Sequence, residues 1–177
     1  TLSRLSVLGK VWLCLAAGAL ALVIFGFAAP GSSLFFPLLS LWCDLALFAA
    51  VLGVLRVARV EFDLFHRAVI IGLWAAALLY FFWALNRRSF VYIWDYANYL
   101  TKQYSAEAAF LQGPGAGFQS IFSSLTDDYT SFITLFLEFP FCLSARTGDD
   151  FAFCQVFSIV PMLLLLLAGL VVKVGQM

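Results

Sequence analysis

Charged side chains are scarce in this chain of 177 residues, at 11% of the sequence, and ten basic residues balance ten acidic ones. An ordinary soluble domain has about a quarter of its residues charged, because charge keeps its surface hydrated. The composition therefore excludes most soluble folds. A formal net charge of zero also leaves no basic surface that could hold nucleic acid, so no nucleic-acid partner is expected.

Cysteine is also infrequent, and none of the four cysteines forms a CxxC pair or another zinc signature. We interpret Cys14, Cys43, Cys142 and Cys154 as small residues of apolar surfaces. The sequence has no Ser-His-Asp, HExxH or EF-hand pattern. The glycine tract at residues 113–117 lacks the lysine and spacing of a P-loop, and it is expected to form a turn.

Apolar residues, by contrast, make up 64% of the chain, and the mean hydropathy is +1.00. A helix needs about 20 apolar residues to cross about 30 Å of hydrocarbon. Residues 11–29, 34–55, 68–85 and 151–172 fit this length, and the shorter run 130–143, which contains Glu138 and Pro140, is expected to span with help from preceding residues. For residues 11–29 a signal peptide is an alternative, because basic residues precede the run and Ala28 and Ala29 end it.

We therefore predict an all-α, polytopic helical membrane protein with about five transmembrane helices. Residues 1–88 are expected to hold three transmembrane helices, residues 89–129 an extracytoplasmic loop with amphipathic juxtamembrane helices at 92–111 and 118–124, and residues 130–177 two transmembrane helices. Basic residues favour a cytoplasmic N-terminus by six to four. This orientation puts the turn at 144–150 in the cytoplasm, and the expected location is the plasma (inner) membrane.

One segment concentrates aromatic side chains around a carboxylate. Read as a helix, it places Tyr92, Asp95, Tyr96, Tyr99 and Gln103 on one face by three- and four-residue spacing. Aromatic rings pack on the apolar faces of sugars, and a carboxylate accepts a hydroxyl proton, so this face suits a carbohydrate or phosphate-sugar. The alternative is an interfacial aromatic belt, where tyrosine and tryptophan collect for physical reasons alone.

Further acids supply candidate sites. Asp127 and Asp128 precede the expected span at 130–143, where they could cap a helix N-terminus or form a second acidic site that binds substrate or a divalent cation. Two acids alone do not define a metal site, so no metal ligand is assigned. Asp44 and Glu138 lie within expected spans, where a charge is costly unless it is paired or faces a cavity. For Asp44 we favour a structural role, and for Glu138 both roles stay open.

Residues 90 to about 173 resemble the first part of a membrane glycosyltransferase of the GT-C superfamily. The resemblance rests on the order of a membrane span, the segment Tyr92-Ile93-Trp94-Asp95-Tyr96-Ala97-Asn98-Tyr99, a glycine-rich break, and Asp127-Asp128-Tyr129 before the next span. It implies a polyprenyl-phosphate-linked sugar as donor and a glycan or lipid of the cell envelope as acceptor. Asp95 would be the catalytic base. The candidate substrate-binding residues are Tyr92, Tyr96, Tyr99, Asp127 and Asp128.

Two features depart from that family. Two spans precede the helix that ordinarily comes first, and about five spans are half the usual number. A complete enzyme would thus need further transmembrane helices, from the same polypeptide or from a partner. Two other functions stay open: a non-catalytic membrane scaffold or subunit, and a transporter or flippase component in which Asp44 and Glu138 share a cavity within the bundle.

Overall fold

Four long apolar helices form the frame of the protein. The structure is a computed structural model that describes residues 6–86, 94–143 and 146–175. The four helices are α1 (Val7–Ala28), α2 (Phe35–Val57), α3 (Leu64–Asn86) and α7 (Gly148–Gly175). Each contains a segment long and apolar enough to cross a bilayer, and few of the residues in these segments are buried within the chain. The chain is therefore an integral membrane protein.

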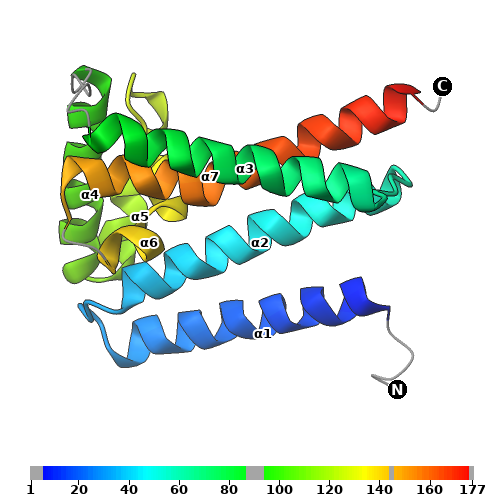
Figure 1. Ribbon diagram of the computed structural model, residues 1–177. Helices are drawn as coiled ribbons and strands as arrows, with labels where there is room; N and C mark the ends of the chain where they lie inside the picture. The colour runs from blue at the N-terminus through cyan, green and yellow to red at the C-terminus, as the bar shows by residue number, and fades with distance from the viewer. Residues whose placement is uncertain (1–5, 87–93, 144–145, 176–177) are drawn as a thin grey trace.

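The four helices lie side by side in the order α1, α2, α7, α3 (Figure 1). Indole N–H groups join two of the neighbouring pairs. The Trp42 Nε1 donates to the Leu15 carbonyl at 2.8 Å, and the Trp74 Nε1 donates to the Val156 carbonyl at 3.3 Å. Away from water such bonds are the main polar contacts that helices can make with one another, so they fix the register of α1 against α2 and of α3 against α7.

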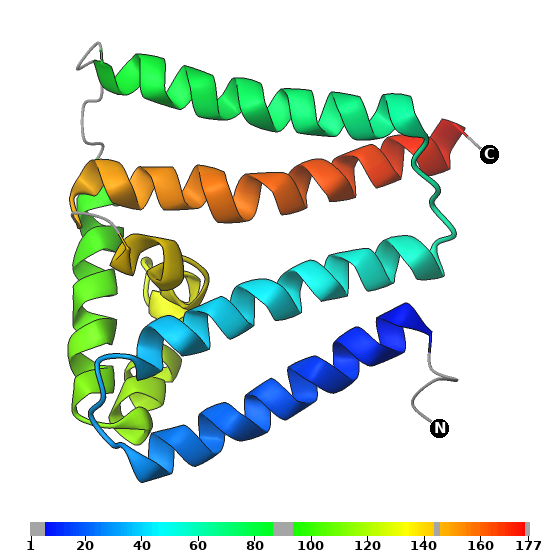
Figure 2. The same cartoon turned by 60° about the horizontal axis from the view of Figure 1, so that its bottom comes forward.

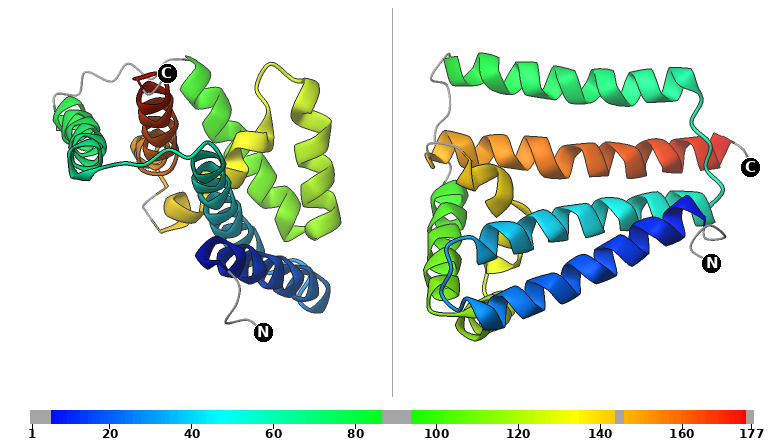
Figure 3. Two further views of the ribbon diagram at one scale, coloured as in Figure 1. Left: turned by 90° about the vertical axis from the view of Figure 1, so that its right-hand side faces the viewer. Right: turned by 90° about the horizontal axis from the view of Figure 1, so that it is seen from below.

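The remaining elements gather at one end of these helices. The start of α1, the α2–α3 connection and the end of α7 lie together at the opposite end (Figure 2). The gathered elements are α4 (Trp94–Leu111), α5 (Pro114–Ser123), the 3-10 helices η2 (Ser124–Thr126) and η3 (Ser131–Phe136), and α6 (Glu138–Cys142). We call residues 94–143 the α4–α6 layer. Within it α4 crosses the ends of the long helices and packs against α5 (Figures 2 and 3).

An aromatic core attaches the α4–α6 layer to the first turns of α2. Phe35 and Phe36 of α2 are buried against Phe110 of α4, and the rings of Phe36 and Phe110 stack with centroids 4.5 Å apart. Ile121 of α5 and Leu135 of η3 complete this core. Burial of such a side chain contributes about 1.5–3 kcal/mol, so the core holds α4 and α5 against one end of the membrane frame.

The fifth span expected at residues 130–143 does not form. These residues fold as η3 and the five-residue α6, which are too short to cross a bilayer. Pro140 has no N–H to continue a helical ladder from η3, and the polar side chains of Ser131, Thr134 and Glu138 are buried against protein rather than lipid. In consequence residues 146–150 lie at the same end as α4, which corrects the prediction that the 144–150 turn is on the other side of the membrane. Residues 144 and 145 lie outside the described part.

The juxtamembrane helices form, with different boundaries from those predicted. α4 ends at Leu111 as expected, and its described part begins at Trp94. The glycine tract was expected to form a turn, but only Gly113, with φ 133°, lies outside a helix. The rest of the tract belongs to α5, which starts at Pro114. Proline is well suited to a first helical position. Gly117 then brings α5 close to α4, since a Cβ at this position would lie 2.2 Å from Cδ1 of Phe110.

Replacing Gly117 by alanine should destabilise the α4–α5 pair. The new Cβ would overlap the Phe110 ring, and such overpacking typically costs about 1–3 kcal/mol. Gly115→Ala is the matched control, because no atom lies within 4 Å of the added Cβ and alanine favours a helix by up to about 1 kcal/mol. Thermal unfolding in one detergent should give a lower Tm for Gly117→Ala and an unchanged or higher Tm for Gly115→Ala. Equal Tm values would contradict the close α4–α5 contact.

Candidate functional site

The residues predicted to carry chemistry lie in the first half of α4 and in the connection from η2 to η3. Asp95 and Tyr96 belong to the first turn of α4. Their side chains lie outside the described part of the structure, as does the whole of Tyr92. Tyr99, one turn after Asp95, is partly buried. The geometry below therefore concerns Tyr99, Asp127 and Asp128.

Two contacts bring the η2–η3 connection onto α4. The Tyr99 ring meets the Tyr129 ring edge to face, with centroids 5.4 Å apart. Lys102 Nζ, one turn further along α4, pairs with Asp127 Oδ2 at 2.8 Å. Tyr99 and Asp127 are thus brought to one region of the α4–α6 layer, while the neighbouring Asp128 is exposed.

Asp127 and Asp128 do not cap the N-terminus of the helix that follows them, which was one of the two predicted roles. The N-cap of η3 is Thr130, whose hydroxyl accepts the Phe132 N–H at 3.1 Å. Asp127 instead pairs with Lys102, a residue that the sequence interpretation did not select. The signal was the spacing, because Lys102 follows Asp95 by seven residues and so lies two turns further along the same face of α4. An exposed pair of this kind contributes about 0.2–1 kcal/mol, so its main effect is to position charges.

A buried polar cluster lies further along α4, where α6 and the start of α7 meet it. Arg146 Nη1 donates to both carboxylate oxygens of Glu107, at 2.6 and 2.8 Å, and Arg146 Nη2 lies 3.6 Å from Glu138 Oε1. The Gln103 side-chain amide donates to Glu138 Oε2. Glu138 and Gln103 are fully buried. We call these four residues, Gln103, Glu107, Glu138 and Arg146, the Arg146 cluster.

The cluster explains Glu138 as a structural residue of the α4–α6 layer. Burial raises the pKa of Glu138 to about 7, and the Glu107 carboxylate adds to the rise, while the Gln103 hydrogen bond and Arg146 oppose it. The hydrogen bonds and charge of Glu107, in turn, raise the pKa of the Arg146 guanidinium. Arg146 has φ 60°, a left-handed conformation that costs a residue with a Cβ about 1 kcal/mol or more. Its ionic contacts offset this cost.

Asp44 lies apart from the Arg146 cluster. It is on α2 and lines a small cavity of about 230 Å³ with Phe139 and Pro140 of α6 and with Ser158 of α7. Glu138 does not line this cavity. The buried Asp44 Oδ1 has no hydrogen-bond partner among the described residues. The structure thus does not bring Asp44 and Glu138 to a shared cavity.

The described residues contain no group of three or more His, Cys, Asp or Glu side chains that could hold a metal ion. Comparisons with protein-family models, with curated proteins and with solved structures find no match to this chain. The resemblance to the GT-C superfamily therefore stays a prediction from the sequence features described above.

Arg146→Ala should destabilise the protein, because the partly buried Glu107 carboxylate would lose its bidentate partner. Hydrogen bonds to a charged group contribute about 1.5–3 kcal/mol each, and the partial exposure of Arg146 and Glu107 places the expected loss near the lower value. In a Glu138→Gln background the same Arg146→Ala change should cost less, since a neutral amide replaces one of the two carboxylates. A double-mutant cycle on thermal unfolding measures this coupling. Additive effects would show that Arg146 and Glu138 act independently.

The raised pKa of Glu138 predicts a loss of stability as the pH rises. The ordinary pKa of the group is 4.5, so between about pH 4.5 and 7 the folded chain keeps a proton that the unfolded chain has lost. The free energy of unfolding should then fall by about 1.4 kcal/mol per pH unit from this group. Glu138→Gln should flatten the profile in this window, and the exposed Asp128→Asn should not. Thermal unfolding across the window checks both, and parallel profiles for wild type and Glu138→Gln would oppose the assignment.

Proposed function

We propose that this chain is a module of an integral membrane glycosyltransferase that transfers a sugar from a polyprenyl-phosphate donor to a cell-envelope acceptor. One observation carries the proposal. The helix that begins with Trp94 and Asp95 follows the span α3 after seven residues, and it lies across the ends of the membrane helices. A carboxylate at the start of α4 therefore belongs to the part of the chain where a lipid-linked substrate and a water-soluble acceptor can meet.

The proposed reaction requires one base. Asp95 takes the proton from the acceptor hydroxyl as its oxygen forms a bond to the anomeric carbon of the sugar. The bond from that carbon to the phosphate oxygen breaks, and polyprenyl phosphate leaves with its electron pair. General-base catalysis of this kind contributes about 10²–10⁴-fold to a rate. Tyr92, Tyr96 and Tyr99 would pack against sugar rings, and Asp127 and Asp128 would orient the substrate by accepting hydrogen bonds from its hydroxyl groups, or would bind a divalent cation.

Lys102 adds a cation to this proposed site. Its ammonium lies 2.8 Å from Asp127 and two helical turns from Asp95 along α4. A leaving phosphate carries negative charge, which a fixed ammonium stabilises. The observed Lys102–Asp127 pair would position this group before the donor binds.

The orientation is proposed from charge. With four spans, one end of the membrane frame holds Lys10, the α2–α3 connection and Lys173. The segments at that end contain six basic residues, against four in the segments at the end that holds α4. Cytoplasmic loops are enriched in lysine and arginine, so this count favours a cytoplasmic N-terminus and an extracytoplasmic α4–α6 layer, in the plasma (inner) membrane. The count is again six to four, as with five spans. Without a span at residues 130–143, Arg146 moves to the extracytoplasmic side and Lys173 to the cytoplasmic side, so the two changes cancel.

Two other functions are less well supported. A transporter or flippase component would have Asp44 and Glu138 around one cavity, whereas Glu138 belongs to the Arg146 cluster and Asp44 lines a separate cavity. A non-catalytic scaffold would use the tyrosines only as an interfacial belt. The scaffold and the enzyme differ in one respect that can be measured, which is the need for the Asp95 carboxylate.

Asp95→Asn should abolish sugar transfer, because an amide cannot take the acceptor proton. The assay measures labelled sugar leaving a polyprenyl-phosphate donor in membranes that contain the full natural polypeptide, with all variants at equal expression. The expected loss is about 10²–10⁴-fold for Asp95→Asn. Glu61→Gln is the matched control, since it removes one carboxylate at the other end of the membrane helices. Equal transfer by wild type and Asp95→Asn would remove Asp95 from the chemistry, and no transfer by wild type would favour the scaffold.

A further inference from the structure

A large cavity lies between α1 and α2, at the end of the frame away from the α4–α6 layer. Its volume is about 1150 Å³. The walls are apolar and come from both helices. Leu15 of α1 and Trp42 of α2 line the end nearer to the α4–α6 layer, where the Trp42 Nε1 donates to the Leu15 carbonyl, and Phe48 and Leu52 of α2 line the part beyond them. Phe48 and Leu52 are exposed, so the cavity opens to the hydrocarbon that surrounds the helices.

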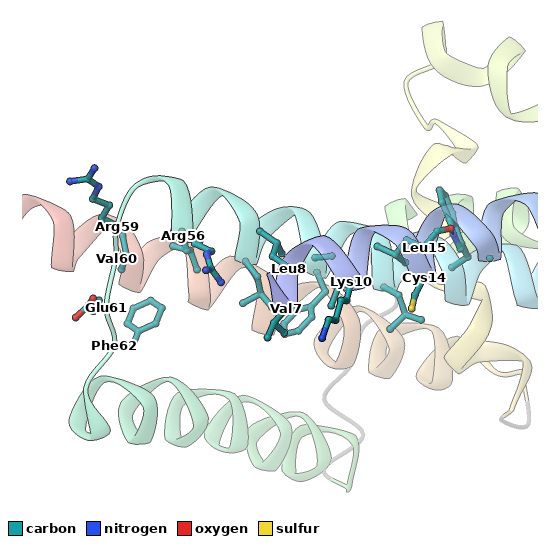
Figure 4. A pocket seen from close by; sticks show the side chains of 18 residues that line it. Val7, Leu8, Lys10, Cys14, Leu15, Arg56, Arg59, Val60, Glu61 and Phe62 are labelled. Atoms are coloured by element: carbon teal, nitrogen blue, oxygen red, sulfur yellow. The ribbon is translucent and has the colours of Figure 1, made fainter. Parts of the chain in front are cut away.

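Two cationic side chains line the part of this cavity that lies away from Trp42. Lys10 of α1 and Arg56 of α2 both line it, with Lys10 nearer to Leu15, and their charged ends point to the same side of the helix pair (Figure 4). Arg59 and Glu61 belong to the same lining, but in the same view their charged ends point away from Lys10 and Arg56. Lys10 and Arg56 form no ion pair within the described part of the chain. Two exposed cations on one side of the helix pair are thus available to an anion.

The depth of the cavity matches one leaflet of a bilayer. Trp42 and Arg56 are fourteen residues apart on α2, which corresponds to about 21 Å at 1.5 Å per residue. Half of a bilayer, including its headgroup region, is about 20–22 Å thick. α2 runs from Phe35 to Val57, so Arg56 lies at its end and reaches headgroup level when the helix spans the bilayer. A bound molecule must be apolar along this length and anionic at its outer end.

We propose that this cavity binds an anionic phospholipid, with an acyl chain between α1 and α2 and the phosphate at Lys10 and Arg56. The cavity opens to hydrocarbon, so an acyl chain can enter it from the bilayer and pack against its apolar walls. Basic residues near the membrane surface attract anionic headgroups, so the two cations select anionic over zwitterionic lipid. The site lies at the opposite end of the frame from Asp95, and the proposal does not depend on the proposed transferase activity.

The first test counts bound lipids on the full chain. The protein is placed in nanodiscs of phosphatidylcholine with a minor fraction of phosphatidylglycerol, and the lipids retained after release are counted by native mass spectrometry. Wild type should retain phosphatidylglycerol in preference to phosphatidylcholine. The Lys10→Gln/Arg56→Gln variant should lose this preference by roughly tenfold or more. Arg59→Gln removes a charge of the same sign that points away, and it should change the preference less than twofold.

The second test places the acyl chain. Phosphatidylglycerol with brominated chains should quench the fluorescence of Trp42, and the Trp42→Phe variant should lack that part of the quenching. Trp74→Phe is the matched control, because Trp74 lies between α3 and α7 and does not line this cavity. The proposal is overturned if brominated phosphatidylcholine quenches Trp42 equally well, if Arg59→Gln loses as much preference as the double variant, or if wild type retains no anionic lipid because another helix fills the cavity.

Discussion

The hydrocarbon solvent is the constraint on which the rest of the structure depends. A backbone N–H or C=O left unpaired in lipid costs several kcal/mol, so a chain that crosses does so as complete helices. α1, α2, α3 and α7 satisfy this condition, and their side chains face lipid without a large internal core. Apart from the two indole N–H bonds within the frame, most polar contacts of the described residues lie at the ends of the helices and in the α4–α6 layer.

In the α4–α6 layer, most buried polar groups are also paired, but several of their partners lie outside the α-helices. Its short helices leave backbone and side-chain polar groups buried against one another, so each group needs a specific partner. Ser40 of α2 accepts the Phe139 N–H at 3.0 Å, and the Ser124 hydroxyl accepts the Ser131 N–H at 2.8 Å. The Arg146 cluster supplies hydrogen-bond partners for Glu107 and for Glu138 Oε2, while the buried Gln103 Oε1 and Glu138 Oε1 have no hydrogen-bond partner among the described residues. It ties α4 to α6 and to the residues that lead into α7, at the point where a fifth span would otherwise have begun.

Much of the frame could be predicted from the sequence, since an uncharged apolar run of about 20 residues has the length and composition of a transmembrane helix. The prediction of a span at residues 130–143 was wrong, because the composition of a segment does not show which residues its polar side chains will contact. The buried Glu138 contacts Gln103 and Arg146, which are 35 and 8 residues away in the chain. Lys102 shares a face of α4 with Asp95 by its seven-residue spacing, but the sequence does not show that Asp127 lies beside it.

The two N-terminal spans, which set this chain apart from the GT-C order, are not a separable addition. α2 contacts α1 and α7 within the membrane frame, and α4, η3 and α6 at its end. Phe36 and Ser40, one turn apart on α2, supply an aromatic surface for Phe110 and a hydrogen-bond acceptor for Phe139. The last turns of α4, which hold Phe110, therefore pack against α2 rather than against α3, their neighbour in sequence. α4 as a whole also contacts η3 and α7, so its position depends on elements that both precede and follow it in the chain.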